Sequence, residues 1–241
     1  EVAQPWSPDM SVPTYHVDGQ IDDEVYVFGS FVQSKMYHNK VKCADCHDPH
    51  TARTYVQGNQ LCMRCHAPKP DKPTLYDTPA HHFHEQGTKG AQCVECHMPE
   101  RTYMVVDPRR DHSIRIPRPD LTVKYGVPNA CNRCHDDKDA AWAAQKIRDL
   151  KGPDRPRELR HPGAFHAFRN RKPDAENLLL AAARDSEAPA FTRAGALLAL
   201  RNFLGPATIA EARRAQCPPM EITPCAPAVA AFLFARRRAM S

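Results

Sequence analysis

The stretch Cys43-Ala-Asp-Cys46-His47-Asp-Pro-His50 contains the motif that decides how this chain must fold. The pattern C-x-x-C-H recurs three more times, as Cys62-Met-Arg-Cys65-His66, Cys93-Val-Glu-Cys96-His97 and Cys131-Asn-Arg-Cys134-His135. In this pattern the two thiols form thioethers with the edge of a porphyrin, and the adjacent imidazole binds its iron. The sequence therefore predicts four covalently bound haem c groups. Their proximal iron ligands are His47, His66, His97 and His135.

Zinc is the main alternative reading of these cysteines, because the 15 residues between Cys46 and Cys62 also suit a zinc ribbon. Zinc does not require a histidine after each pair. With 13 histidines among 241 residues, a histidine follows all four pairs by chance with odds of roughly one in a hundred thousand. A thioredoxin-like redox motif is disfavoured because no βαβ pattern surrounds any pair. The haem interpretation is preferred.

Each iron needs a second axial ligand, and histidine is the residue best placed to supply it. Nine histidines lie outside the four motifs: His16, His38, His50, His81, His82, His84, His112, His161 and His166. The seven methionines are scattered, and Met98 lies too close to His97 to reach the opposite side of the same iron. We therefore expect bis-histidine ligation.

The preferred distal ligands are His16, His50, His84 and His112. His50 follows His47 by three residues, at most about 10 Å of extended chain, so it must serve a different haem from His47. The run from His81 to His84 should yield one or two ligands, with His84 preferred and His81 or His82 as replacements.

His112 follows Arg109 and Arg110, which are suited to pair with haem propionates. His16 is far from every motif, and a bond to iron would tie down the N-terminal segment. His38, His161 and His166 are expected to be solvated or core side chains instead.

The proline content, the four motifs and the helical period of the later residues predict a mainly α fold with much irregular structure, in which a multihaem cytochrome c core wraps around four haems and a short helical tail follows. Hydrophobic residues make up 41% and prolines number 23, about twice the usual share of about 5%. We expect a wrapping segment (1–40), a tetrahaem domain (41–152) and a helical tail (153–241). An extended piece is expected at 24–28, and helices at 136–150, 174–184, 189–204, 208–215 and 227–238.

The chain is expected to work outside the cytoplasm, in the periplasm or extracellularly, because covalent haem attachment occurs there. It begins at Glu1 rather than Met, as a processed secretory protein would. No run approaches the ~18 apolar residues of a membrane span, which disfavours an integral membrane protein. In an oxidising compartment Cys217 and Cys225 are expected to form a disulfide, with two free thiols as the alternative.

Several stretches, some of which contain the motifs, resemble a family of secreted multihaem cytochromes c with C-terminal HEAT-like or tetratricopeptide-like repeats. They are Gly29 to Met36, Cys43 to His66, Cys93 to Pro99, Arg110 to His112 and Pro128 to Cys131. The resemblance implies that the helical tail here is a short stub of such repeats. The C-H-M-P element with a later Asp-His is also similar to part of the multihaem nitrite reductase and hydroxylamine oxidoreductase superfamily. That resemblance implies axial ligand roles for His112, His50 and the group at 81–84. No pair here is followed by lysine, as the catalytic haem of the pentahaem nitrite reductases requires.

The preferred function is electron transfer without enzymatic activity, through a row of bis-histidine haems in anaerobic or extracellular respiration. A reductase of the nitrite or hydroxylamine type with one open haem is the first alternative, and a subunit of an extracellular cytochrome filament is the second. Residues 136–241 carry a net charge of +6, from 18 basic and 12 acidic residues. This tail is expected to dock redox partner proteins, further copies of the chain or a larger redox complex. We do not expect nucleic acid as a partner, because the basic residues do not form a dense stripe in the sequence.

Overall fold

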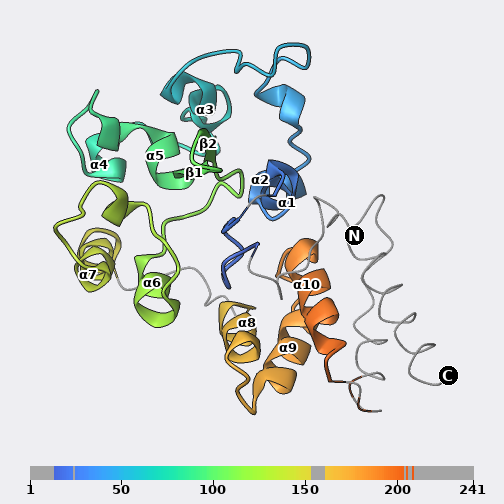
Figure 1. Ribbon diagram of the computed structural model, residues 1–241. Helices are drawn as coiled ribbons and strands as arrows, with labels where there is room; N and C mark the ends of the chain where they lie inside the picture. Colours follow the sequence, from blue (N-terminus) through green and yellow to red (C-terminus); the bar gives the residue numbers. More distant parts are fainter. Residues whose placement is uncertain (1–13, 24, 153–160, 204, 206–207, 209–241) are drawn as a thin grey trace.

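The structure is a computed structural model that describes residues 14–23, 25–152, 161–203, 205 and 208. It is mainly helical, with long irregular connections and one two-stranded hairpin. The four cysteine motifs lie in one part of the molecule, and the last three described helices form a second part beside it (Figure 1). The N-terminal residues 14–23 run between the two parts (Figure 1). The expected fold class, mainly α with irregular segments, is therefore observed.

The helices of the first part are short because prolines and loops interrupt them. They are α1 (Val27–Phe31), α2 (Lys35–His38), α3 (Asn59–His66), α4 (Pro79–His82), α5 (Cys93–His97) and α6 (Pro119–Tyr125), with the 3₁₀ turns η1 (Cys43–Asp45), η2 (Lys89–Ala91) and η3 (Cys131–Arg133). Helix α3 ends where Ala67, the residue before Pro68, turns to an extended conformation. This is the conformation that a following proline imposes.

One expected element is wrong: the extended piece at 24–28 gives way to helix α1, which begins at Val27. Gly29 and Ser30 are buried in this helix, and a Cβ at Gly29 would lie 2.2 Å from the Tyr15 hydroxyl. The glycine therefore allows close packing of α1 on Tyr15. This tertiary contact outweighs the β propensity of the local sequence.

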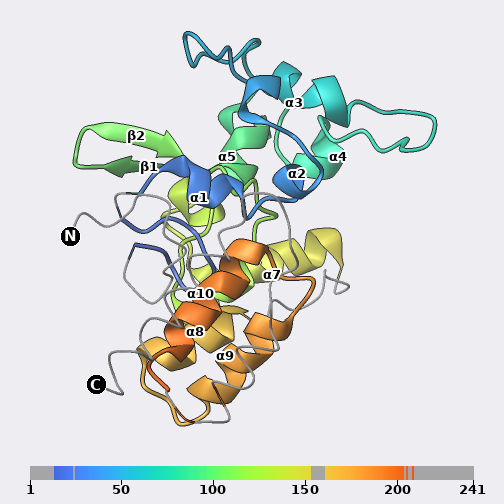
Figure 2. The same ribbon diagram turned by 90° about the vertical axis from the view of Figure 1, so that its right-hand side faces the viewer.

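A β-hairpin that the sequence did not suggest follows the third motif. Strands β1 (Glu100–Tyr103) and β2 (Asp107–Arg110) pair antiparallel, with Glu100 opposite Arg110 and Tyr103 opposite Asp107. The hairpin projects from the body of the molecule (Figure 2), and Val105 at its tip is 92% exposed. Its second strand leads into the loop that carries His112.

Longer helices follow the fourth motif, several of them as predicted. They are α7 (Ala140–Lys151), α8 (His161–Arg169), α9 (Ala175–Arg184) and α10 (Ala190–Leu200). Helix α7 begins later than predicted because the Asp139 carboxylate caps it, accepting a hydrogen bond from Trp142 N at 2.7 Å. Helix α8 was not predicted. The helices expected at 208–215 and 227–238 and the Cys217–Cys225 disulfide lie outside the described residues, apart from Thr208.

One hydrophobic core joins the three expected segments. It includes Tyr15 from the N-terminal segment, Leu121 from α6, and Leu179 and Leu200 from the tail helices. Tyr15 is fully buried, with its ring edge-on to Phe191 of α10 at a centroid distance of 5.4 Å. The tail helices thus complete the core beneath the N-terminal segment. Among the described residues, no helix is long and apolar enough to cross a membrane.

Candidate haem-binding site

Each cysteine motif is wound into a helical turn that brings its two thiols to one side. In the first motif the Cys43 carbonyl accepts from Cys46 N at 3.1 Å and from His47 N at 2.9 Å, and the fourth motif repeats this pattern around Cys131. The second and third motifs lie in α3 and α5. Residues three apart on a helical turn are neighbours, so both thiols can reach one porphyrin edge. None of the eight thiols is in a disulfide.

Three of the four motif histidines face a second imidazole at the same distance. The ring centroids of His47 and His112 are 6.2 Å apart, as are those of His97 and His81 and those of His135 and His84. A metal–imidazole bond is about 2 Å, so an iron between two imidazoles would hold their ring centroids about 6 Å apart. These three pairs therefore fit bis-histidine haem sites.

The hydrogen bonds of these rings also suit iron ligation. Nδ1 donates to a backbone carbonyl in four rings: His47 to Ala52 O at 2.8 Å, His84 to His82 O at 2.5 Å, His97 to Arg115 O at 2.7 Å and His112 to Arg110 O at 2.9 Å. This bond places the proton on Nδ1 and leaves Nε2 free to bind a metal. His81 differs, because its Nδ1 lies 3.4 Å from Lys151 Nζ at the end of α7.

Burial keeps several of these imidazoles in the neutral form that binds metals. It is the main cause that lowers the pKa of His97, His112 and His81. For His81 the nearby Lys151 ammonium lowers the pKa further, and for His112 the motif histidine His47 does so. A neutral imidazole offers its lone pair to iron without first losing a proton.

The remaining motif histidine, His66, has an aromatic neighbour instead of an imidazole. Its ring meets Tyr76 edge-on at a centroid distance of 5.9 Å, and Tyr76 also meets His81 edge-on at 5.2 Å. Tyr76 therefore lies between a motif histidine of the second site and the partner of His97 in the third.

The predicted ligands His16 and His50 lie in different surroundings from the three pairs. Nε2 of His16 is 3.2 Å from an Asp22 carboxylate oxygen and 3.1 Å from Arg101 Nη1, so this ring belongs to a polar cluster near the hairpin. His50 is exposed in the loop after the first motif, where its backbone N donates to Asp48 at 3.0 Å. The segment after this loop lies beside the second motif, since the Arg64 guanidinium is 5.6 Å from the ring centroid of Tyr55.

The other histidines outside the motifs have protein partners. His82 Nε2 lies 3.2 Å from the Gln86 side chain, His166 packs on Tyr125, and His38 packs on Tyr37. His161 is buried, with Nε2 3.4 Å from Asp18 O, and burial lowers its pKa to about 4.

Consecutive attachment sites adjoin through their cysteines. Cys46 of the first site interacts electrostatically with Cys65 of the second. The Cys62 thiol of the second donates a hydrogen bond to Cys93 of the third, which raises the pKa of Cys62 and lowers that of Cys93. Cys96 of the third interacts with Cys131 of the fourth, although burial is the main cause that raises its pKa to about 11. The four sites thus follow one another in space in chain order.

Two features of the site were not assigned from the sequence. The pairing of both His81 and His84 depends on α4 and on the left-handed turn at Phe83, which point the two rings toward different motifs. Gly90 leaves room for the His84 ring, because a Cβ there would lie 2.4 Å from His84 Cδ2. A glycine six residues after a histidine cluster is too common a pattern to have signalled this contact.

Among the described residues, no group of three or more His, Cys, Asp and Glu side chains is arranged to hold a bare metal ion. No curated protein and no solved structure matches the chain. Residues 27–109, which include the first three motifs, match the model of the Class III cytochrome C family. Together with the motif geometry, this match supports a multihaem c-type cytochrome with covalently bound haem, a class of electron-transfer proteins.

Proposed function

We propose that this protein transfers electrons through four haems c, each held between two imidazoles. The observation that carries this proposal is the recurrence of one centroid distance, 6.2 Å, in three imidazole pairs that each contain a motif histidine. Bound haem supplies an iron that accepts and releases one electron at a time. The chain supplies the attachment thiols, the two imidazoles and the burial around them.

Contact between successive motifs favours a continuous row of haems. The electrostatic interaction of Cys46 with Cys65, the hydrogen bond between Cys62 and Cys93 and the electrostatic interaction of Cys96 with Cys131 support this order of neighbouring sites. Because thioether attachment fixes the porphyrin edge to these sulfurs, neighbouring motifs bring neighbouring cofactors together. An electron can then enter at one end of the row and leave at the other.

On the basis of the imidazole pairs, we propose three distal ligands: His112 at the first site, His81 at the third and His84 at the fourth. For the second site we propose His50. Its side chain is exposed, and the segment after its loop lies beside the second motif through the contact between Arg64 and Tyr55. His81 thus replaces His16 in the proposed set, because His16 is bonded to Asp22 and Arg101.

Full axial ligation favours an electron carrier over a reductase, because it leaves no iron position for a substrate. We place the protein in the periplasm or outside the cell, in anaerobic or extracellular respiration, since haem c is attached outside the cytoplasm. A nitrite or hydroxylamine reductase with one open haem would be supported instead if one iron lacked its second imidazole.

The helical tail is proposed to dock the redox partners. Helices α8, α9 and α10 pack in succession, as the helices of a short repeat stub would (Figure 2). The net charge of +6 on residues 136–241 suits an acidic partner or another copy of the chain. If this is correct, reduction by the partner slows as salt rises. Light scattering at low salt would show whether copies assemble into oligomers or filaments.

The decisive experiment counts haems and their spin states. The mass of the holoprotein should exceed that of the polypeptide by four haem increments, and the ferric protein should give low-spin electron paramagnetic resonance (EPR) signals only. The reduced protein should not bind carbon monoxide. A mass with fewer haems would contradict the count of four. A high-spin ferric signal with carbon monoxide binding would favour the reductase.

A further inference from the structure

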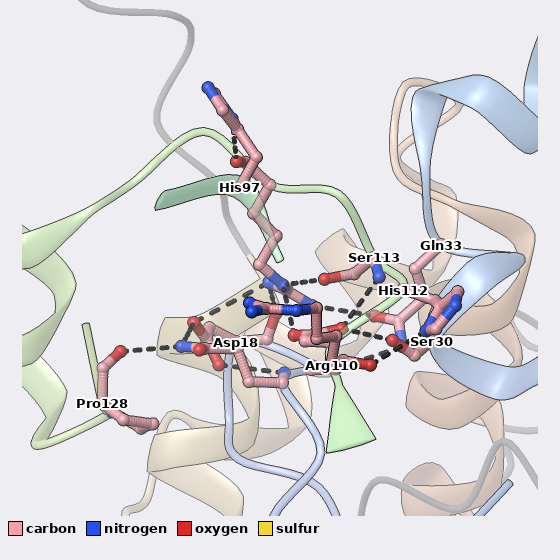
Figure 3. A network of polar contacts seen from close by, with 12 residues as sticks. Asp18, Ser30, Gln33, His97, Arg110, His112, Ser113 and Pro128 are labelled. Atoms are coloured by element: carbon pink, nitrogen blue, oxygen red, sulfur yellow. Dashed lines mark hydrogen bonds and ion pairs between the residues drawn. The ribbon is translucent and has the colours of Figure 1, made fainter. Parts of the chain in front are cut away.

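The loop between β2 and α6 is hydrogen-bonded to imidazoles of two different sites (Figure 3). The Arg110 carbonyl accepts from Nδ1 of His112 at 2.9 Å, and the Arg115 carbonyl accepts from Nδ1 of His97 at 2.7 Å. Arg115 N also donates to His97 O at 3.0 Å. We call residues 110–115 the ligand strap. It contacts the imidazole that faces His47 at the first site and the motif imidazole of the third.

A buried carboxylate organises the ligand strap. One oxygen of Asp111 accepts from Ser113 N at 2.8 Å and from the hydroxyl of Ser30 in α1. Its other oxygen lies 3.6 Å from Arg115 Nε. The Asp111 backbone N donates to Pro99 O at 3.1 Å. Asp111 thus connects the strap to Ser30 of α1 and to Pro99, two residues after the third motif.

Arg115 anchors the far end of the strap to the N-terminal segment. Its Nη1 donates to Asp18 O at 2.7 Å, and its Nε donates to the Ser113 hydroxyl at 2.5 Å. Ile114, which lies between Ser113 and Arg115, has φ of 48°, a left-handed conformation that is unfavourable for a β-branched side chain. Such a conformation persists where surrounding contacts fix it. The strap is therefore a defined structure and not a loose loop.

Arg110 anchors the near end to the third motif. Its Nη2 donates to Glu95 at 2.7 Å and its Nη1 to Met98 O at 3.1 Å, both in or beside α5. Arg110 therefore contacts both sites: its carbonyl accepts from His112, and its guanidinium binds the helix that carries His97. A movement of the Arg110 backbone at the first site should therefore also shift its contacts at the third site.

We propose that Asp111 is a positioning residue that sets the axial ligands of the first and third haems together. This inference rests on the ligand assignment proposed above. A hydrogen bond from Nδ1 to a carbonyl fixes the orientation of an imidazole and raises its basicity, which tunes the metal. Because both carbonyls belong to one strap, loosening the strap changes both ligands at once. The first and third sites are not neighbours in the row, so this link bypasses the second.

The test compares two variants that loosen the strap with one that does not. Asp111→Asn removes the charge and weakens the bonds of the carboxylate, whereas Ser30→Ala removes a neutral donor to the same carboxylate. Asp149→Asn on the exposed face of α7 also removes one negative charge and serves as the control. EPR spectra and redox titrations of the holoproteins are recorded. The signals of the first and third haems are marked beforehand with His112→Ala and His81→Ala.

The expected result is a shift of the g-values and midpoint potentials of both marked haems, larger in Asp111→Asn than in Ser30→Ala. The other two haems and the Asp149→Asn protein should keep wild-type values. A shift of all four haems, of one alone or of none would overturn the proposal. If Asp111→Asn does not assemble with four haems, the g-values and midpoint potentials of Ser30→Ala decide whether the proposal holds. If His112→Ala and His81→Ala leave the spectrum unchanged, the ligand assignment itself has failed, whatever the strap does.

Discussion

The imidazole rings of His81 and His97 lie nearly parallel, with 10° between their planes and 6.2 Å between their centroids. The other two pairs are tilted by 31° and 35°. The angle between axial imidazole planes influences the EPR spectrum of a low-spin ferric haem, so the third haem should be distinguishable from the first and fourth.

Replacing His81 with alanine should open the third haem. We expect one of four haems to become high-spin in the ferric state and to bind carbon monoxide when reduced, because the iron loses one axial imidazole. His82→Ala is the matched control, since His82 is the adjacent residue and bonds to Gln86. Equal spectra for the two variants would contradict the pairing of His81 with His97.

Histidines 50 and 16 give opposite expectations. His50→Ala should convert the second haem to the high-spin form, because His50 is the only histidine between the first and second motifs and is proposed as the distal ligand of the second site. His16→Ala should leave four low-spin haems, because His16 bonds to Asp22 and Arg101. Optical and EPR spectra of the two purified holoproteins provide the comparison. A high-spin haem in His16→Ala alone would restore His16 as the ligand.

Gly90→Ala should disturb the fourth haem without touching a ligand directly. The added Cβ would lie 2.4 Å from Cδ2 of the His84 ring, so the imidazole must shift from its present position opposite His135. Overpacking of this kind costs about 1–3 kcal/mol. We expect a high-spin fraction at one haem and a stability loss of that order in denaturant unfolding.

Gly87→Ala is the control that separates the clash with His84 from the effect of replacing a glycine of the same loop. Gly87 has φ of 85° but nothing within 4 Å of an added Cβ, so alanine there meets backbone strain without a steric clash. It should lower stability by about 1 kcal/mol and keep four low-spin haems. A high-spin haem in Gly87→Ala as well would show that the loop, and not the contact with His84, sets the ligand.

The buried His161 should make the protein sensitive to acid. Burial lowers its pKa to about 4 in the native state, whereas the unfolded chain has about 6.5. The unfolded state therefore takes up a proton that the native state does not, and stability falls as pH drops from about 6.5 to about 4. This group accounts for a loss of about 2 kcal/mol between pH 7 and pH 5. His161→Gln should reduce that loss in denaturant titrations at the two pH values, and an unchanged loss would contradict the prediction.

The motifs were readable from the sequence because thioether chemistry needs cysteines and histidine at fixed local spacing. The imidazole pairs were harder to predict, because they form between distant segments. The surroundings of His16 illustrate this: its partners Asp22 and Arg101 meet only when the hairpin packs beside the N-terminal segment. Helix α1 illustrates the same limit, since its β-prone residues become helical through packing on Tyr15.

Helix α9 was predicted within one residue of its observed bounds, whereas α10 begins near the predicted residue but ends at Leu200 instead of 204. Both were predictable because their apolar residues follow a helical period between prolines and charged ends. Their packing against the N-terminal segment was not predicted. Nothing local in α10 indicates that Phe191 would pack on Tyr15, more than 170 residues earlier in the chain. The ligand strap likewise brings Asp18, Ser30 and Asp111 together over long sequence separations.

The tail and the haem part should lose stability together when Phe191 is truncated. Phe191 is 1% exposed and packs edge-on against Tyr15, whose hydroxyl lies beside Gly29, the residue before Ser30. Phe191→Ala should cost about 3 kcal/mol or more, as for other buried phenylalanines. Phe28→Ala, at a 49% exposed position of α1, should cost much less. Denaturant unfolding is followed both by helical circular dichroism and by the haem absorption band. Because one core joins the two parts, both signals should move to lower denaturant concentration by the same amount. A loss of helical signal that leaves the haem transition in place would show that α8 to α10 form a separate unit whose packing does not support the haem ligands.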